Sequence, residues 1–274
     1  SEKPLGASLR EGEGIAALAR GKGLMLGGAP DTFLGAGIQT CRKLIEDGYI
    51  GKPVGAAGFM ICRGHESWHP DPDFYYQYGG GPMMDMGPYY LTAMVNLLGG
   101  VSSVTALTRT TFPERTITSK EHFGETIDVH VPTYFTGMME FESGIIGTLF
   151  TTFDVYYPGQ SRLEIYGSEG TLFVPDPNTF GGPIKLLRPE QGEVMEIPLT
   201  FPYRENSRAL GLADMAKAIQ TGRQHRANGE LTFHVLEVME AFAASGASHQ
   251  PVEIHSRPRL TPPMPPMGKP GVLD

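Results

Sequence analysis

The chain has 274 residues, of which 22 are basic and 30 acidic, so its formal net charge is −8 at neutral pH. This acidic balance opposes non-specific binding to nucleic-acid phosphates and to anionic lipid, and no block of Lys and Arg interrupts it. The 36 glycines and 23 prolines are spread as turns between apolar runs, which excludes collagen-like, coiled-coil and disordered chains. We therefore expect a folded, turn-rich protein that binds neither nucleic acid nor membranes.

Cysteine usage and the absence of long apolar runs bear on the compartment. Cys41 and Cys62 are the only cysteines, and two isolated thiols give neither a disulfide framework nor a cysteine zinc site. No run of 18 apolar residues and no leader pattern is present. We expect a soluble, cytoplasmic protein.

Residues 1–30 are typical of the end of an α/β layer. Ser8 and Glu11 form a capping box before an amphipathic helix, and residues 24–26 predict a short buried strand. A helix that leads into a buried strand is a fragment of a β-α-β unit and cannot form a sheet alone. We expect its neighbouring strands to come from elsewhere, because its backbone groups would otherwise lack partners.

The pattern over residues 31–257 predicts two helices around a strand, then a run of strands, then two closing helices. The first helices cover about 34–47 and 84–98, the strand between them 54–62, and the closing helices about 206–221 and 231–245. Short turns separate the later strands, so successive strands should be antiparallel neighbours. These strands are expected at 101–111, 129–131, 134–141, 145–153, 162–166, 171–174, 184–187 and 194–197.

The predicted fold class is therefore α/β followed by α+β. A β-α-β remnant at residues 1–30 precedes a domain over residues 31–257, which is built on a large, mostly antiparallel open sheet flanked by helices. The tail at residues 258–274 is Pro-rich and should be an extended arm or disordered.

Residues 65–69, His-Glu-Ser-Trp-His, match the zinc-protease pattern H-E-x-x-H, which needs a helix to place both imidazoles on one face. Here Gly64 breaks regular structure and Pro70 pushes the second histidine toward extended backbone. We predict a loop and assign no metal ligand, and a metal assay would test the alternative of a zinc hydrolase. The loop either caps and bridges its neighbours or contacts a substrate, through His65, Glu66, Trp68 and His69.

Two glycine-rich segments have different interpretations. Residues 35–40 carry a lone G-x-G that ends on Thr40 where a dinucleotide motif has glycine or alanine, so we interpret it as a flexible helix start. Residues 79–81 are three glycines that precede an apolar helix, in which Asp85 and Tyr89 are four residues apart and share a face. A carboxylate and a phenol beside a glycine turn suit the wall of a polar site.

Five segments in chain order carry a family pattern: residues 2–5 (Glu-Lys-Pro-Leu), 44–53, 79–87, 166–172 and the closing helices with 251–254 (Pro-Val-Glu-Ile). Together they resemble the Gfo/Idh/MocA family of NAD(P)-dependent sugar and cyclitol oxidoreductases. The resemblance implies that residues 1–30 close a dinucleotide-binding Rossmann domain and that residues 31–257 form the substrate and oligomerisation domain. The glycine-rich phosphate turn of that family is absent, and we expect an N-terminal portion to precede this chain.

The resemblance also implies roles for single residues. The lysine of the Glu2-Lys3-Pro4 segment would touch the cofactor and the substrate, and Asp85 would contact the substrate. The family's usual catalytic histidine is Tyr89 here, and the aspartate that often follows it is Thr92. We therefore predict Lys3, Asp85 and Tyr89 as the catalytic residues, with His65 or His69 as the reserve base.

The predicted function is hydride transfer between NAD or NADP and a hydroxyl-bearing carbon of a sugar, sugar derivative or cyclitol. The alternatives are an NAD-dependent glycoside-cleaving enzyme and a non-catalytic binding or scaffold relic. The large sheet with few covering helices predicts a homodimer or homotetramer. The sequence does not identify the sugar, the carbon or the choice between NAD and NADP.

Overall fold

The computed structural model describes residues 1–157, 159, 162–266 and 271–274. In these residues one nine-stranded sheet runs in the order β10-β9-β8-β7-β1-β6-β5-β2-β11. Its strands are β1 (Pro53–Ile61), β2 (Val101–Arg109), β5 (Tyr134–Phe141), β6 (Ile146–Thr152), β7 (Arg162–Gly167), β8 (Thr171–Val174), β9 (Ile184–Leu187), β10 (Val194–Ile197) and β11 (Val252–Glu253). This sheet confirms the predicted fold class.

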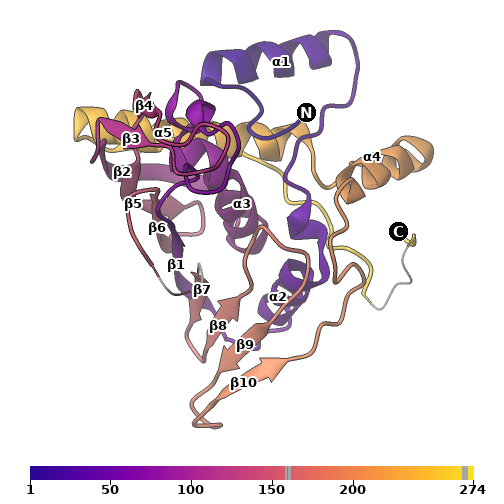
Figure 1. The fold of residues 1–274 in the computed structure, drawn as a ribbon. Helices are drawn as coiled ribbons and strands as arrows, with labels where there is room; N and C mark the ends of the chain where they lie inside the picture. Colours follow the sequence, from indigo (N-terminus) through magenta and orange to yellow (C-terminus); the bar gives the residue numbers. More distant parts are fainter. Residues whose placement is uncertain (158, 160–161, 267–270) are drawn as a thin grey trace.

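Helices cover one face of the sheet (Figure 1). The long helix α5 (Gly229–Ser248) packs on β2, α3 (Gly81–Leu98) packs on β1, β5 and β6, and α2 (Ala36–Glu46) packs on β8. Two short 3₁₀ turns, η1 (Thr32–Leu34) and η2 (Asp73–Tyr76), lie before α2 and α3. The core lies between these helices and the sheet, since α3 is apolar nearly all round and almost every residue in it is buried.

The pairing of β1 is the main topological feature that the sequence pattern did not predict. It lies parallel to β6, from Gly55 opposite Ile146 to Ile61 opposite Thr152, and antiparallel to β7 on its other side. The remaining neighbours in the sheet pair antiparallel, as the short turns indicated. Along the chain, α3, β2 and β5 come between β1 and β6. In the sheet, β1 lies in the middle, between β7 and β6.

The predicted strand at residues 24–26 is wrong. The helix before it, α1 (Leu9–Gly21), forms and is capped by the Ser8 side chain, but after it only Gly27 makes an isolated bridge, with Asn228. Leu24 is 62% exposed and Met25 45%. The described chain supplies no neighbouring strand for this segment, so Leu24 and Met25 face solvent, while Leu26 packs partly on the core.

Smaller corrections concern the boundaries of elements. The strand expected at 129–131 lies earlier, at β4 (Thr126–Asp128), and pairs with β3 (Glu114–Thr116), whose polar sequence carried no strand signal. The helix α4 (Leu210–Thr221) begins later than expected because Ala209 before it has a left-handed backbone, with φ 77°. None of the helices in the described ranges is both long and apolar enough to span a bilayer.

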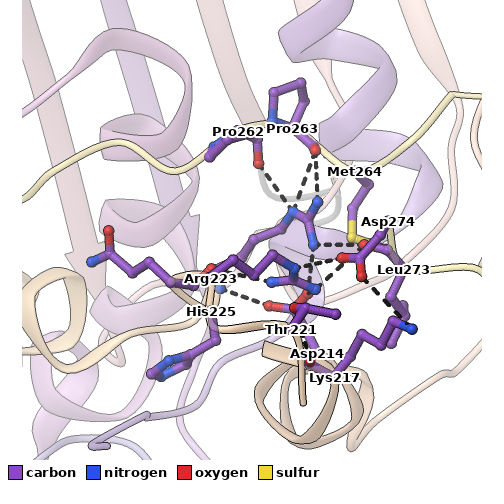
Figure 2. Close-up of polar contacts among 12 residues, drawn as sticks. Asp214, Lys217, Thr221, Arg223, His225, Pro262, Pro263, Met264, Leu273 and Asp274 are labelled. Carbon is purple, nitrogen blue, oxygen red and sulfur yellow. Dashed lines mark hydrogen bonds and ion pairs between the residues drawn. The ribbon is translucent and has the colours of Figure 1, made fainter. Parts of the chain in front are cut away.

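The Pro-rich tail is held against the body of the protein. The Arg226 guanidinium donates to the carbonyls of Pro262, Pro263 and Leu273, and it pairs with the fully buried Asp214. Asp214 also accepts from Arg223, which binds the carboxylate of Asp274 (Figure 2). The described part of the tail is therefore an extended, anchored segment.

Candidate functional site

Three charged or ionisable side chains from distant parts of the chain meet at Asp85. The Lys3 ammonium donates to Asp85 Oδ1 and to the Asp85 carbonyl, both at 2.6 Å. On the other carboxylate oxygen, Oδ2, His65 Nε2 lies at 3.3 Å. The structure thus brings together the lysine of the first segment, the histidine of the loop after β1, and the carboxylate of α3.

The position of Lys3 is set by the anchored N-terminal segment. Leu5 is almost completely buried, and the Ser1 amino group donates to the Gly27 carbonyl. The Lys3–Pro4 peptide is cis. With both sides of the segment held, the Lys3 side chain reaches α3, 82 residues further along the chain.

Asp85 lies in the second turn of α3, because the helix begins at Gly81 rather than near residue 84. Burial by itself would raise the pKa of this carboxyl, but the hydrogen bond from His65 and the positive charge of Lys3 outweigh that effect. Its pKa therefore lies below the ordinary value. Asp85 is held as a carboxylate that accepts hydrogen bonds.

Tyr89 lies one turn after Asp85, and its ring is flanked by two cations. The Lys3 ammonium is 5.4 Å from the ring centroid and the Arg208 guanidinium is 5.8 Å from it. Only 8% of Tyr89 is exposed. The expected convergence of Lys3, Asp85 and Tyr89 is present, while their roles in a reaction stay a prediction.

His65 sits in an aromatic surround. Its ring centroid lies 4.2 Å from that of Tyr75, 4.7 Å from Phe153 and 5.2 Å from Trp68. Trp68 is 61% exposed, so it offers an open aromatic face beside His65. An exposed indole next to hydrogen-bonding groups is suited to stacking on the apolar face of a sugar ring.

The H-E-x-x-H segment is a turn, as predicted, and its two histidines have different neighbours. His69 Nδ1 accepts from the Asp71 backbone N–H, and its ring packs on Tyr75, whereas His65 faces Asp85. Within the described ranges, no group of three His, Cys, Asp or Glu side chains is arranged to hold a metal ion.

Glu66 does not face the site. Its carboxylate is buried and binds the guanidinium of Arg115, with the Nε to Oε1 distance at 2.8 Å, and it also accepts from the Tyr76 hydroxyl. Arg115 in turn pairs with Asp154 at 3.0 Å and donates to the carbonyls of Arg63 and Phe153. Glu66 is therefore a buried ion-pair partner that fixes the loop carrying His65, and its direct contact with a substrate stays a prediction.

The glycine turn brings the aromatic loop close to α3. A Cβ atom on Gly80 would lie 2.6 Å from the Phe74 carbonyl and 2.7 Å from the Tyr75 carbonyl. No side chain fits at such distances, so glycine is required there for a steric reason. The same turn thus sets both the start of α3 and the position of the Tyr75 ring against His65.

The start of α2 does not offer a phosphate cradle. The Ala36 N–H donates to the Tyr203 carbonyl and the Gly37 N–H to the Phe180 carbonyl. A Cβ on Gly37 would lie 2.0 Å from the Gly181 carbonyl. These glycines serve packing against residues 180–181, and the backbone N–H groups of Ala36 and Gly37 are already engaged, which leaves neither of them free for a phosphate.

Two cavities in the described part of the chain lie away from Asp85. One of about 550 Å³ lies between α1 and the start of α5, and one of about 690 Å³ lies over β7, β8 and β9. Neither is lined by Lys3, His65 or Tyr89. We place the candidate site at the Asp85 cluster because a lysine, a histidine and a carboxylate make direct contact there.

Two residues near the site were missed by reasoning from the sequence. Arg208 precedes α4 and Arg115 lies on β3, and neither belongs to a motif with a known spacing. Both are far in sequence from the residues that they contact. Only the fold brings them to Tyr89 and Glu66.

The chain is similar in sequence to known proteins. Residues 38–173 match the family described as GFO/IDH/MocA C-terminal domain. The chain is 23% identical over 249 residues to the D-xylose dehydrogenase of Paenarthrobacter nicotinovorans, with 82% of this chain and 63% of that protein covered. A D-xylose 1-dehydrogenase (NADP(+)) of Haloferax volcanii is 25% identical over 72% of this chain and 54% of its own length.

Solved structures share the fold. A levoglucosan dehydrogenase in complex with NADH and levoglucosan superposes with a TM-score of 0.74 at 21% identity, covering 93% of this chain and 72% of that one. The chain spans only 63% and 54% of the lengths of the two D-xylose dehydrogenases, respectively.

Proposed function

We propose, from the match of residues 38–173 to the GFO/IDH/MocA C-terminal domain, that the chain belongs to that family and handles the substrate in an NAD(P)-dependent oxidoreductase. The substrate is a sugar, a sugar derivative or a cyclitol. The proposal rests chiefly on one observation, the meeting of Lys3, His65 and Asp85 beside Tyr89. The sugar dehydrogenases among the relatives support the substrate class.

The bound nicotinamide cofactor would supply the hydride chemistry, and the residues described here bind the substrate and move its proton. Asp85, held as a carboxylate, accepts hydrogen bonds from sugar hydroxyls. Lys3 belongs to the segment proposed to bind the cofactor, and its ammonium contacts Asp85. It therefore orients the hydroxyl whose carbon is oxidised. Glu2 and Pro4 would bind the nucleotide together with Lys3.

The proton of that hydroxyl needs an acceptor, and two side chains are placed for this role. Tyr89 stands where family members carry the catalytic histidine, one helical turn from Asp85. His65 reaches the same carboxylate through its other oxygen. We assign the proton transfer to Tyr89 and treat His65 as the alternative base, with Trp68 and His69 lining the outer side of the loop.

The domain organisation, oligomeric state and compartment belong to the same proposal. Residues 1–30 would close a dinucleotide-binding domain, residues 31–257 form the substrate and oligomerisation domain, and residues 258–274 are the tail. We propose a homodimer or homotetramer formed through the uncovered sheet face. The free thiols of Cys41 and Cys62 favour a reducing compartment, and we propose the cytoplasm.

The test is substrate-dependent reduction of NAD or NADP by the complete protein, measured over a panel of aldoses and cyclitols. Asp85→Asn is expected to raise KM more than it lowers kcat, because the amide fills the same space but donates where the carboxylate accepts. Lys3→Ala is expected to lower kcat. A complete protein that reduces neither cofactor with any of these substrates, or an Asp85→Asn variant with unchanged kinetics, contradicts the proposal.

A further inference from the structure

Arg208 is the second cation at the Tyr89 ring, and it differs from Lys3 in its charge balance. The Lys3 ammonium is neutralised by Asp85 at 2.6 Å. The Arg208 guanidinium has an amide as its hydrogen-bond partner, the Asn178 side-chain oxygen at 2.9 Å. Among the described residues no carboxylate lies within ion-pair distance of it. Arg208 is exposed, so solvent rather than a carboxylate faces its positive charge, which leaves the guanidinium accessible to an anion.

The backbone around Arg208 holds it in place. The next residue, Ala209, has a left-handed backbone, with φ 77°, which is unfavourable for a residue with a Cβ. The Leu210 N–H donates to the Ser207 carbonyl and the Ala213 N–H to the Ala209 carbonyl, so the turn leads directly into α4. A strained backbone of this kind persists where the surrounding structure fixes it, which is common at ligand sites.

The partner of Arg208 is also fixed. Asn178 donates its backbone N–H to the Asp176 carboxylate at 2.9 Å, within a turn that the Thr179 side chain closes on the Asp176 carbonyl. The Asp176 carboxylate is thereby engaged with backbone. The Asn178 amide orients the guanidinium without cancelling its charge.

We propose that Arg208 forms an anion subsite at the edge of Tyr89, and that the substrate of the proposed oxidoreductase carries a carboxylate, as a sugar acid does. A guanidinium binds a carboxylate through two parallel N–H donors, which fixes both the distance and the orientation of the bound group. With Asp85, Lys3 and Arg208 all gathered around the Tyr89 ring, a sugar acid is held at its hydroxyl and at its carboxylate. This inference rests on the proposed function, because it takes Tyr89 and Asp85 as the reacting end of the site.

The experiment compares pairs of ligands that differ in a single group. The dissociation constants of D-glucuronate and D-galacturonate are measured by NMR titration against D-glucose, D-galactose and the neutral D-glucuronamide. The wild-type chain is expected to bind a uronate about tenfold more tightly than the parent aldose and the amide, since a charge-assisted hydrogen bond contributes that much. Raising the salt to about 0.15 M should reduce this preference, because salt screens the attraction between the guanidinium and the carboxylate.

Variants identify the residue responsible. Arg208→Gln should weaken uronate binding about tenfold while aldose binding is unchanged, and Arg208→Lys should retain part of the preference. Arg204→Gln is the matched control: it makes the same charge change on the same segment, where Arg204 donates to the Leu199 carbonyl. Equal uronate affinity in Arg208→Gln and wild type, or an equal loss in Arg204→Gln, overturns the proposal.

Two further arms distinguish the anion subsite from the proposed function and from a cofactor phosphate site. Asp85→Asn should weaken aldoses and uronates alike if the proposed function holds. If aldose binding depends on Asp85 but uronates are not preferred, the anion subsite alone is overturned. If uronates are preferred through Arg208 but Asp85→Asn changes the binding of neither ligand class, the proposed function alone is overturned. Titrations with NAD⁺ and inorganic phosphate form the last arm. If Arg208→Gln weakens the binding of these probes and leaves uronate binding unchanged, the anion is a cofactor phosphate and the substrate assignment is wrong. A wild-type protein that binds no uronate at all also overturns the proposal.

Discussion

At the scale of single residues, Asp85 connects the candidate site. Its two carboxylate oxygens are divided between Lys3 and His65, so neither neighbour competes for the same atom. These bonds keep the carboxyl ionised although it is largely buried. A hydroxyl of a substrate that enters the site must bind beside these bonds or replace one of them. Asp85 is thus the residue through which a substrate would contact both Lys3 and His65.

Substitutions at Tyr89 and His65 test which of them transfers the proton. Tyr89→Phe in the complete protein should lower kcat by roughly 10²–10⁴-fold, the usual contribution of a positioned acid or base. His65→Gln keeps hydrogen-bonding capacity at Asp85 and should have a smaller effect. Steady-state kinetics with a sugar that the complete protein oxidises decide between them. A larger loss of kcat in His65→Gln than in Tyr89→Phe would assign the base to the histidine loop.

Arg115 is the residue whose loss should most disturb the loop. Its side chain is only 2% exposed and pairs with Glu66 and Asp154. Arg115→Met removes the buried positive charge that both carboxylates share, which costs about 3–5 kcal/mol of unfolding free energy. Denaturant unfolding measures this loss. The variant that also carries Glu66→Gln and Asp154→Asn should recover part of it, and a loss below about 1 kcal/mol in the single variant contradicts the role.

At the scale of elements, α3 and α5 hold the site to the sheet. Asp85 and Tyr89 lie on α3, which begins at the glycine turn and packs on β1, β5 and β6. α5 packs beside α3 and carries His234, which is fully buried and accepts from the Val101 N–H at 3.0 Å. The buried His234 imidazole thus ties α5 to the first residue of β2. Because α5 also packs on α3, this contact supports the helix that carries the site.

His234 should make the stability of the fold pH-dependent. Burial lowers the pKa of His234 to about 4 from its ordinary 6.5, although the nearby Glu237 opposes this effect. A folded-state pKa below the unfolded one means that the stabilisation is present above pH 6.5 and is lost as pH falls toward 4. The loss is on the order of 3 kcal/mol, because each pKa unit corresponds to about 1.4 kcal/mol.

His234→Gln retains an acceptor for the Val101 N–H and does not titrate. The difference in unfolding free energy between about pH 7 and about pH 4 should therefore be smaller in this variant than in the wild type. Urea unfolding at several pH values measures both proteins. An identical pH dependence in the two proteins would show that His234 is not the group responsible.

At the scale of the whole molecule, the sheet has one covered and one uncovered face. The uncovered face carries Leu107, Met138 and Ile146, each more than half exposed. Next to them, the rings of Phe59 and Phe150 contact across the parallel pair β1 and β6. An apolar surface of this kind marks an interface, which is the basis of the proposed homo-oligomer.

A charge placed on this face should dissociate the oligomer. Met138→Lys is expected to yield monomers at micromolar concentration, because an ammonium buried in a symmetric interface meets its own copy or apolar side chains. Light scattering gives the mass. Ile219→Lys on α4 is the control, as Ile219 is similarly exposed but lies away from the sheet. A monomeric wild-type chain, or an oligomer that survives Met138→Lys, contradicts the interface.

Most elements and their order follow from local sequence patterns alone. The bounds of β5, β8, β9 and β10 agree with the pattern because alternation of side chains is a local property of a strand. Motif spacing also placed Asp85 and Tyr89 on one helical face. The boundary errors fall where local signals were weak, as in the polar strand β3, or where a partner strand was missing, as after α1.

Which distant groups meet depends on the three-dimensional fold. The parallel pairing of β1 with β6, the ion pair of Glu66 with Arg115 and the approach of Arg208 to Tyr89 join segments far apart in the chain. Such contacts depend on which surfaces are buried together, and a partner for a buried charge is chosen by geometry rather than by spacing along the sequence. The sequence predicted a loop at the H-E-x-x-H segment, but only the fold shows that His65 faces Asp85 and that Glu66 points into the interior.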